Sequence, residues 1–188
     1  KEEADHTFKY HVNFELLEEY MKKNSQVGAI CVTRPTNPSG NVLTDSEITR
    51  LSKIAKQYSI PLIIDNAYGL PWPNIIFTSD ASPYYDDNVV LSMSLSKIGL
   101  PSLRTGIIIA PAEIVTAIGN MNAIAALASG SFGQALAENL IKTGALVEKA
   151  KNFVRPYYEN KAKKAAQAFH KYFAGTDYAV HKSEGSIF

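Results

Sequence analysis

The chain has 188 residues, of which 46% are hydrophobic and 20% charged, the usage of an ordinary globular protein. Its formal net charge of +1 supplies no strong field for nucleic acid or an anionic membrane, and no apolar run is long enough to span a bilayer. A single cysteine, Cys31, cannot form an internal disulfide, which favours a reducing, cytoplasmic compartment. The chain begins with Lys1 and has no signal-peptide pattern, so we expect part of a longer cytoplasmic protein.

Strand-like and helical patterns alternate along the chain. Buried strands are predicted at residues 27–33, 61–65, 89–94 and 105–110, and helices at residues 14–21, 44–58, 111–127, 134–143 and 148–173. Thr44 and Glu47 form the pattern of a capping box at the start of the second helix. Pro156 is expected to kink the last helix, and a new element is expected from Gly175 onward.

This alternation predicts the fold class. Apolar strands separated by helices are typical of an α/β protein with a mostly parallel sheet that helices cover on both faces, in three α/β/α layers. Functional side chains in such sheets gather in the loops beyond the carboxyl ends of the strands. Three candidate motifs lie at such ends.

The strongest candidate motif follows the third predicted strand. It places Lys97 behind two hydroxyls, those of Ser94 and Ser96, with Arg104 seven residues further on. A lysine amine in a desolvated or cationic environment becomes a nucleophile toward carbonyl groups, while hydroxyls and a guanidinium suit a phosphate. Taken alone, the motif is equally consistent with a solvated lysine after a strand.

Two further motifs follow the first and second predicted strands. Asp65 and Tyr68 come directly after an apolar run, where a carboxylate requires a partner; the alternative is an aspartate that caps the next helix. Asn37 lies in a Pro-Thr-Asn-Pro-Ser-Gly segment, and in isolation an ordinary turn is the better interpretation of that segment. The three motifs together are more specific than any one of them.

In this order and spacing, the motifs resemble those of the class I/II aminotransferases, which are fold type I enzymes dependent on pyridoxal 5′-phosphate (PLP). Within that family the similarity is greatest to the valine–pyruvate aminotransferase group, and it covers essentially the whole chain. The similarity rests on the sequence segments at residues 8–12, 34–38, 64–69, 93–97 and 106–110. The resemblance implies that the sheet belongs to the large domain of this fold and that its last strand is antiparallel to the others.

The resemblance also implies a role for each motif. Lys97 corresponds to the lysine that holds PLP covalently and then moves the proton between the substrate Cα and the cofactor. Asp65 corresponds to the aspartate that pairs with the pyridine nitrogen. Asn37 and Tyr68 correspond to donors to the phenolic oxygen of the cofactor, and Tyr68 is grouped with the catalytic residues. We expect Asn37, Asp65 and Lys97 to converge near the strand ends.

Ser94 and Arg104 correspond to phosphate ligands of the family, and Ser96 is an additional candidate. Lys97 and Arg104 are seven residues apart, where many members of the family have eight, so this loop is expected to be one residue shorter. The four histidines have no metal-ligand spacing, and no metal site is expected.

For the whole protein, the resemblance implies transamination between valine and pyruvate, with amino-acid and 2-oxo-acid substrates and a homodimeric assembly. Residues 1–150 would form the C-terminal half of the PLP-binding large domain, and residues 151–188 the interdomain helix and the start of the small domain. The family's glycine-rich loop, stacking ring and carboxylate-binding arginine are not among these residues, so we expect the 188 residues alone to be inactive and free of PLP. Ser129–Ser131 are a weaker candidate for contact with a neighbouring subunit's phosphate site.

Two alternatives remain open for the function. An aminotransferase-like domain can belong to a transcriptional regulator, and a PLP-dependent C–S β-lyase uses the same aspartate and lysine. The sequence does not fix the substrate either, because a pocket discriminates one methylene by only about 1–3 kcal/mol.

Overall fold

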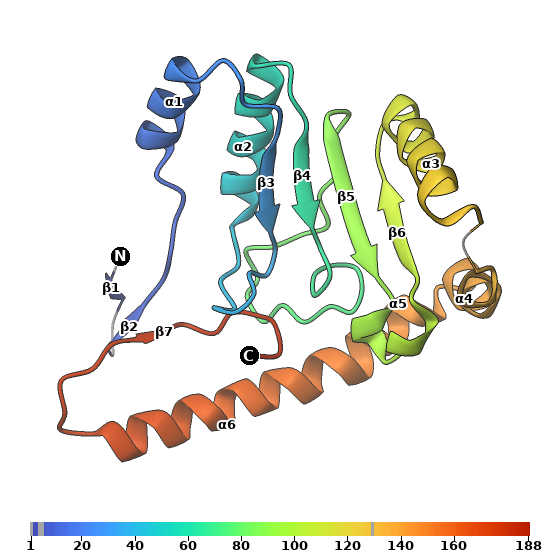
Figure 1. The fold of residues 1–188 in the computed structure, drawn as a ribbon. Coiled ribbons are helices and arrows are strands. Elements are labelled where there is room, and N and C mark those ends of the chain that lie inside the picture. The colour runs from blue at the N-terminus through green and yellow to red at the C-terminus, as the bar shows by residue number, and fades with distance from the viewer. Residues whose placement is uncertain (1, 4–5, 129) are drawn as a thin grey trace.

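The computed structural model of the chain describes residues 2–3, 6–128 and 130–188, so that Ser129, in the weaker candidate for a subunit contact, lies outside the described residues. Its central feature is a sheet in which β3 (Ile30–Thr33), β4 (Leu62–Asp65), β5 (Val89–Ser94) and β6 (Gly106–Ile109) are adjacent in that order (Figure 1). The first three strands are parallel, and β6 is antiparallel to β5. The four predicted strands and the direction of the last one are therefore confirmed.

Helices and short turns connect these strands. The helices are α1 (Phe14–Lys23), α2 (Asp45–Gln57), α3 (Ala112–Ala126), α4 (Phe132–Lys142), α5 (Ala145–Lys149) and α6 (Arg155–Phe173), and the 3₁₀ turns η1 (Ser96–Ile98) and η2 (Pro101–Leu103) follow β5. Of the helices in the described part of the chain, none has the length and apolar character to cross a membrane.

The predicted helix over 148–173 is helical throughout, and its regular α-helical bonding is interrupted just before Pro156. α5 ends at Lys149, and a π-helical segment over Ala150–Val154 precedes α6. Pro156 lies in the first turn of α6. Since proline has no N–H to donate and its ring crowds the carbonyl four residues before it, regular α-helical bonding is interrupted at this point.

A second, smaller sheet joins the start of the described chain to its end. It contains β1 (Glu2–Glu3), β2 (Thr7–Phe8) and β7 (Val180–His181), with β2 in the middle and parallel to β7 (Figure 1). Strands of two residues are too short to show an alternating pattern, so the sequence did not predict this pairing. β7 is the new element that was expected after Gly175.

α2 begins with the predicted capping box and packs on the main sheet. Thr44 Oγ1 accepts a hydrogen bond from Glu47 N at 3.2 Å, and Glu47 Oε2 accepts one from Thr44 N at 2.9 Å. The helical spacing of Ile48, Leu51 and Ile54 places them on one side of α2, and that side contributes to the hydrophobic core.

The sheet has one buried face and one open face, because successive side chains of a strand point to opposite sides. The core face packs with α1 and α2 and carries Ile30, Val32, Leu62, Ile64, Val89, Leu91, Met93 and Ile107. By strand register, the open face carries Cys31, Thr33, Ile63, Asp65, Val90, Ser92, Ser94 and Ile108. The mostly parallel α/β architecture confirms the predicted fold class. On the open face, where a third layer would pack, Cys31 and Ile108 are exposed to solvent among the described residues.

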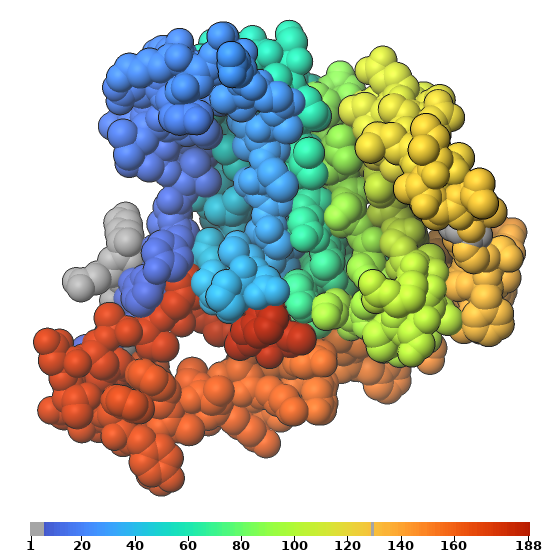
Figure 2. All heavy atoms as spheres, viewed as in Figure 1, coloured from blue at the N-terminus to red at the C-terminus, as the bar shows by residue number. Residues whose placement is uncertain are grey.

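α6 runs beneath the carboxyl ends of β3, β4 and β5, and the chain ends near the same place (Figure 1). In Figure 2 the last residues, in dark red, lie directly below the light-blue loop that follows β3. This arrangement brings the end of the described chain to the edge of the sheet where the three candidate motifs begin.

Candidate active site

Polar side chains gather on the open face at the carboxyl ends of the parallel strands. Thr33, Asp65 and Ser92 are register partners on β3, β4 and β5, and Ser94 lies two residues further along β5. Neighbouring strands lie about 4.8 Å apart, so Asp65 and Ser94 line the same edge of the sheet. In open α/β sheets this edge is where ligands bind.

Asp65 is half-buried at the end of β4. Its Oδ1 accepts a hydrogen bond from Ala67 N at 3.0 Å, and its main-chain oxygen accepts one from Arg34 N at 2.9 Å. Residues 66–74 contain turns and no helix, so the alternative that Asp65 caps a following helix is wrong. Because no other group among the described residues bonds to this carboxylate, Oδ2 is available to a ligand.

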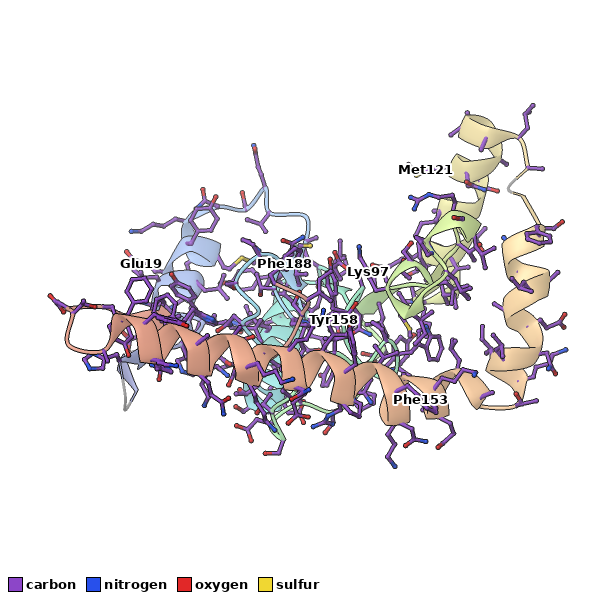
Figure 3. The ribbon with its side chains drawn as sticks, turned by 90° about the horizontal axis from the view of Figure 1, so that it is seen from below. Glu19, Lys97, Met121, Phe153, Tyr158 and Phe188 are labelled. Atoms are coloured by element: carbon purple, nitrogen blue, oxygen red, sulfur yellow. The ribbon has the colours of Figure 1, made fainter. Side chains whose placement is uncertain are left out.

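Tyr68 and Lys97 meet across the loops that follow β4 and β5. Lys97 Nζ lies 5.4 Å from the centroid of the Tyr68 ring, and Tyr68 is buried. Phe188 packs edge-on against the same ring, with ring centroids 5.9 Å apart. Figure 3 shows Lys97 and Phe188 near the middle of the molecule when it is seen from below. The Lys97 side chain is exposed, so its amine is accessible to a ligand from this side.

The loop that joins β5 to β6 is compact and rich in donors. Ser94 Oγ accepts a hydrogen bond from Ser96 N at 3.1 Å, and two residues, Gly99 and Arg104, have positive φ angles of 103° and 47°. Arg104 is exposed, and its Nη1 donates to Pro101 O at 3.4 Å. Two hydroxyls and a guanidinium within residues 94–104 are groups of the kind that bind a phosphate.

Asn37 lies in a closed turn after β3. Thr36 N donates to Asn41 O and Gly40 N donates to Thr36 O, both at 2.8 Å, while the Asn37 side chain is exposed. Within the described parts of the chain, no bond or ring contact joins Asn37 or Arg104 to the other predicted site residues. The structure thus brings Tyr68 to Lys97 and Ser94 to Ser96, while Asn37, Asp65 and Arg104 make no direct contact with these side chains among the described residues.

Arg34 organises this edge, although no role was assigned to it from the sequence. Its buried guanidinium donates to Leu43 O and to Asp45 Oδ1, each at 2.7 Å, and to Ser82 O at 3.2 Å. Burial alone would raise the pKa of Asp45, but the hydrogen bonds from Arg34 and Ser82 outweigh it and lower that pKa. The signal in the sequence was a charged residue between an apolar strand and a proline, where burial requires such partners.

Comparisons with known proteins agree with this geometry. The family model described as aminotransferase class I and II matches residues 4–188. Valine–pyruvate aminotransferase from Escherichia coli (strain K12) is 46% identical over 181 residues, which are 96% of this chain and 42% of that protein. A crystal structure of valine–pyruvate aminotransferase from Salmonella typhimurium LT2 has a TM-score of 0.88 at 43% identity, covering 97% of this chain and 46% of that one.

A more distant similarity shows the fold alone. Kynurenine aminotransferase from Pyrococcus horikoshii, solved in complex with PMP, has a TM-score of 0.76 at 22% identity, covering 93% of this chain and 44% of that one. The chain therefore spans less than half the length of these three relatives. Since the family model extends over nearly the entire sequence, this chain belongs to the class I and II aminotransferases.

Proposed function

We propose that the whole protein containing these residues is a PLP-dependent aminotransferase that moves an amino group between valine and pyruvate. The single observation that carries the proposal is the accessible Lys97 amine, which lies 5.4 Å from the Tyr68 ring at the edge of the sheet that also holds Asp65. The choice of valine and pyruvate rests on the 46% identity to the Escherichia coli enzyme of that name. A homodimeric assembly is part of the proposal, supported by exposed apolar side chains on α3 such as Ile124.

The residues present fit this cofactor. A half-buried carboxylate with one oxygen available, that of Asp65, suits a cationic ring nitrogen. The lysine amine suits the carbonyl carbon of the cofactor. The hydroxyls of Ser94 and Ser96 and the guanidinium of Arg104 come from one segment, residues 94–104, and are groups that suit a phosphate.

When bound, PLP supplies a conjugated ring that accepts electrons from the substrate Cα. Lys97 Nζ would hold the cofactor until substrate arrives and, once free, would take the proton from Cα as a general base. Asp65, as a carboxylate, would keep the ring nitrogen protonated by pairing with it. The Asn37 amide and the Tyr68 hydroxyl would donate to the phenolic oxygen of the ring.

Substitution of the lysine in the protein made from its complete reading frame tests this proposal. Lys97→Ala should remove the covalent PLP that borohydride reduction fixes to the wild-type protein, and it should lower the rate with valine and pyruvate by about 10²–10⁴-fold. Lys22→Ala, a change at an exposed lysine on α1, is the matched control and should leave both measurements unchanged. Asp65→Ala should retain some PLP while losing most of the activity.

Each result bears on a separate part of the proposal. Covalent PLP and full activity in Lys97→Ala would refute the assigned site. Elimination of sulfur from a cysteine conjugate, without transfer of the amino group from valine to pyruvate, would replace the transaminase with a C–S β-lyase. PLP binding with no turnover of either substrate would favour a regulatory protein.

A further inference from the structure

A buried ion pair joins the beginning of the described chain to its end. Lys9 Nζ and Glu184 Oε2 are 2.5 Å apart, and the two side chains are only 4% and 5% exposed. Lys9 directly follows β2 and Glu184 lies three residues after β7, so the pair extends the small β1–β2–β7 sheet toward the main one. Charges are rarely this buried unless they are paired and hydrogen-bonded.

Glu184 also bonds to the turn that contains Asn37. Its Oε2 accepts a hydrogen bond from Val42 N at 3.4 Å, and its main-chain N donates to Gly40 O at 3.3 Å. On its other side, its main-chain oxygen accepts a hydrogen bond from Phe77 N at 2.7 Å. Glu184 therefore lies between the turn after β3 and the segment that follows the Tyr68 loop.

The contact between these segments is too close for side chains at two glycines. A Cβ at Gly40, whose φ is +71°, would lie 2.7 Å from Gly185 O. A Cβ at Gly185 would lie 2.6 Å from Ile75 O and 3.0 Å from the ring of Pro35. Real Cβ contacts do not occur at the shorter of these distances, so the turn and the segment fit together only with glycine at both positions.

A second polar contact ties the same turn to β7 and to the N-terminal segment. Asn41 Oδ1 lies 3.1 Å from His181 Nε2 and accepts a hydrogen bond from Tyr10 N at 3.2 Å. Asn41 O in turn accepts the hydrogen bond from Thr36 N that closes the turn around Asn37. The turn is thus held from outside the main sheet at Gly40, Asn41 and Val42.

We propose that Glu184, with its charge balanced by Lys9 and by the more distant Lys182, is a positioning residue that fixes the turn carrying Asn37 in the geometry needed at the cofactor. This inference rests on the proposed function, in which Asn37 donates to the phenolic oxygen of PLP. In this proposal Glu184 acts through its hydrogen bonds to the main chain at Gly40 and Val42 and is assigned no contact with substrate or cofactor. A buried ion pair contributes little net stability compared with an apolar pair, whereas it fixes the relative position of the groups it joins.

The first test measures the turn itself in the cofactor-free protein, made from its complete reading frame. Glu184→Gln keeps the shape of the side chain and removes the charge. Hydrogen exchange of the amides of residues 36–37 and 39–42 should become about tenfold faster, as expected when a hydrogen bond to a charged group is weakened. Amides of α2 serve as the internal reference and should not change. Glu138→Gln breaks an exposed ion pair with Lys142 and should change neither region.

The second test asks whether Glu184 acts through Asn37. In PLP titrations, Glu184→Gln and Asn37→Ala should each weaken binding and each lower kcat/KM by about tenfold or more, since small misplacements of positioning groups have effects of this size. The double variant should be no worse than Asn37→Ala alone. Where Glu184→Gln does not fold, Lys9→Met combined with Glu184→Met removes both charges, and the same exchange and the same non-additivity are expected.

The outcomes separate this inference from the proposed function. Unchanged PLP binding and kcat/KM in Asn37→Ala would refute the role of Asn37 and remove the basis of the inference. Normal exchange of residues 36–42 in Glu184→Gln would overturn the positioning role of Glu184. Full additivity of Glu184→Gln and Asn37→Ala would also overturn it, because Glu184 would then act by another route.

Discussion

The two faces of the main sheet are built from the same strands and differ in their packing and polarity, although Val90 on the open face is as buried as Leu91 on the core face. On the core face, Leu62 and Val89 are fully buried and Ile64 nearly so, against α1 and α2. On the open face, the apolar residues give way to Asp65 and Ser94 toward the carboxyl ends of β4 and β5. The core face thus stabilises the fold, while the open face presents the polar side chains of the candidate active site.

This difference explains why the candidate site lies where it does. A carboxylate or an amine on the core face would lose its hydration without a partner. On the open face, Asp65 is half-buried and Lys97 is exposed, so both remain available to a ligand. The packed face still contributes to the site, because it fixes the strand ends from which the loops with Asp65 and Lys97 depart.

Adjacent isoleucines on β4 give the most direct test of the difference between the two faces, with the largest expected effect. Ile64 is 2% exposed on the core face, and Ile63 is half-buried on the open face. Ile64→Ala should lower the free energy of unfolding by about 2–5 kcal/mol because it leaves a cavity, whereas Ile63→Ala should cost less than about 1 kcal/mol. Urea denaturation of the two variants measures both values. Equal losses would show that the two faces are packed alike.

The main sheet could be predicted from the sequence because its determinants are local. Each strand is a short apolar run that ends at residues typical of a turn, and the capping box at Thr44 marks the start of α2. The small sheet and the Lys9–Glu184 pair could not be predicted, since a strand of two residues shows no period and Lys9 gives no sign of a partner at the other end of the chain. The interruption before α6 was signalled by Pro156 but was expected as a kink.

The candidate site was predictable in its components and less so in its organisation. The order of the three motifs identified the residues, and strand register accounts for the shared edge that holds Asp65 and Ser94. The contact between Tyr68 and Lys97 depends on how two loops fold, which no periodicity encodes. The buried network of Arg34 depends on carbonyls from distant loops, so only the tertiary structure shows it. The catalytic and cofactor-binding roles themselves stay predictions.

Substitution of a glycine in the loop after β4, which carries Tyr68, should give the next largest loss of stability. A Cβ at Gly69 would lie 1.9 Å from Asn66 Oδ1 and 2.6 Å from Arg34 O. Gly69→Ala should therefore cost about 1–3 kcal/mol of stability and displace the neighbouring Tyr68. Gly28 has no atom within 4 Å of a Cβ position, so Gly28→Ala is the matched control. Urea denaturation compares the two, and a loss in Gly28→Ala as large as that in Gly69→Ala would contradict the close-packing argument.

The smallest change in stability that we expect comes from a single carboxylate beside the packed core, that of Glu47. Glu47 is buried in the first turn of α2, where its Oε2 accepts the hydrogen bond from Thr44 N and its Oε1 accepts one from Val12 N at 3.0 Å. Burial alone would raise the pKa of Glu47, but these N–H donors, together with the Thr44 hydroxyl and the nearby His11, outweigh it and lower that pKa. The carboxylate thereby ties the N-terminal segment to α2.

The sign of the pH dependence follows from that lowered pKa. A carboxyl group with a lower pKa in the folded state stabilises the fold fully above its ordinary pKa of about 4.3, and this contribution is lost as the pH falls through the folded-state value. Glu47→Gln should therefore cost about 1 kcal/mol near neutral pH and progressively less below about pH 4. Glu113→Gln, in the first turn of the exposed α3, should change stability by less than about 0.5 kcal/mol at any pH. Urea denaturation near pH 7 and near pH 3 measures the difference, and an equal loss for Glu47→Gln at both would contradict the role of the carboxylate charge.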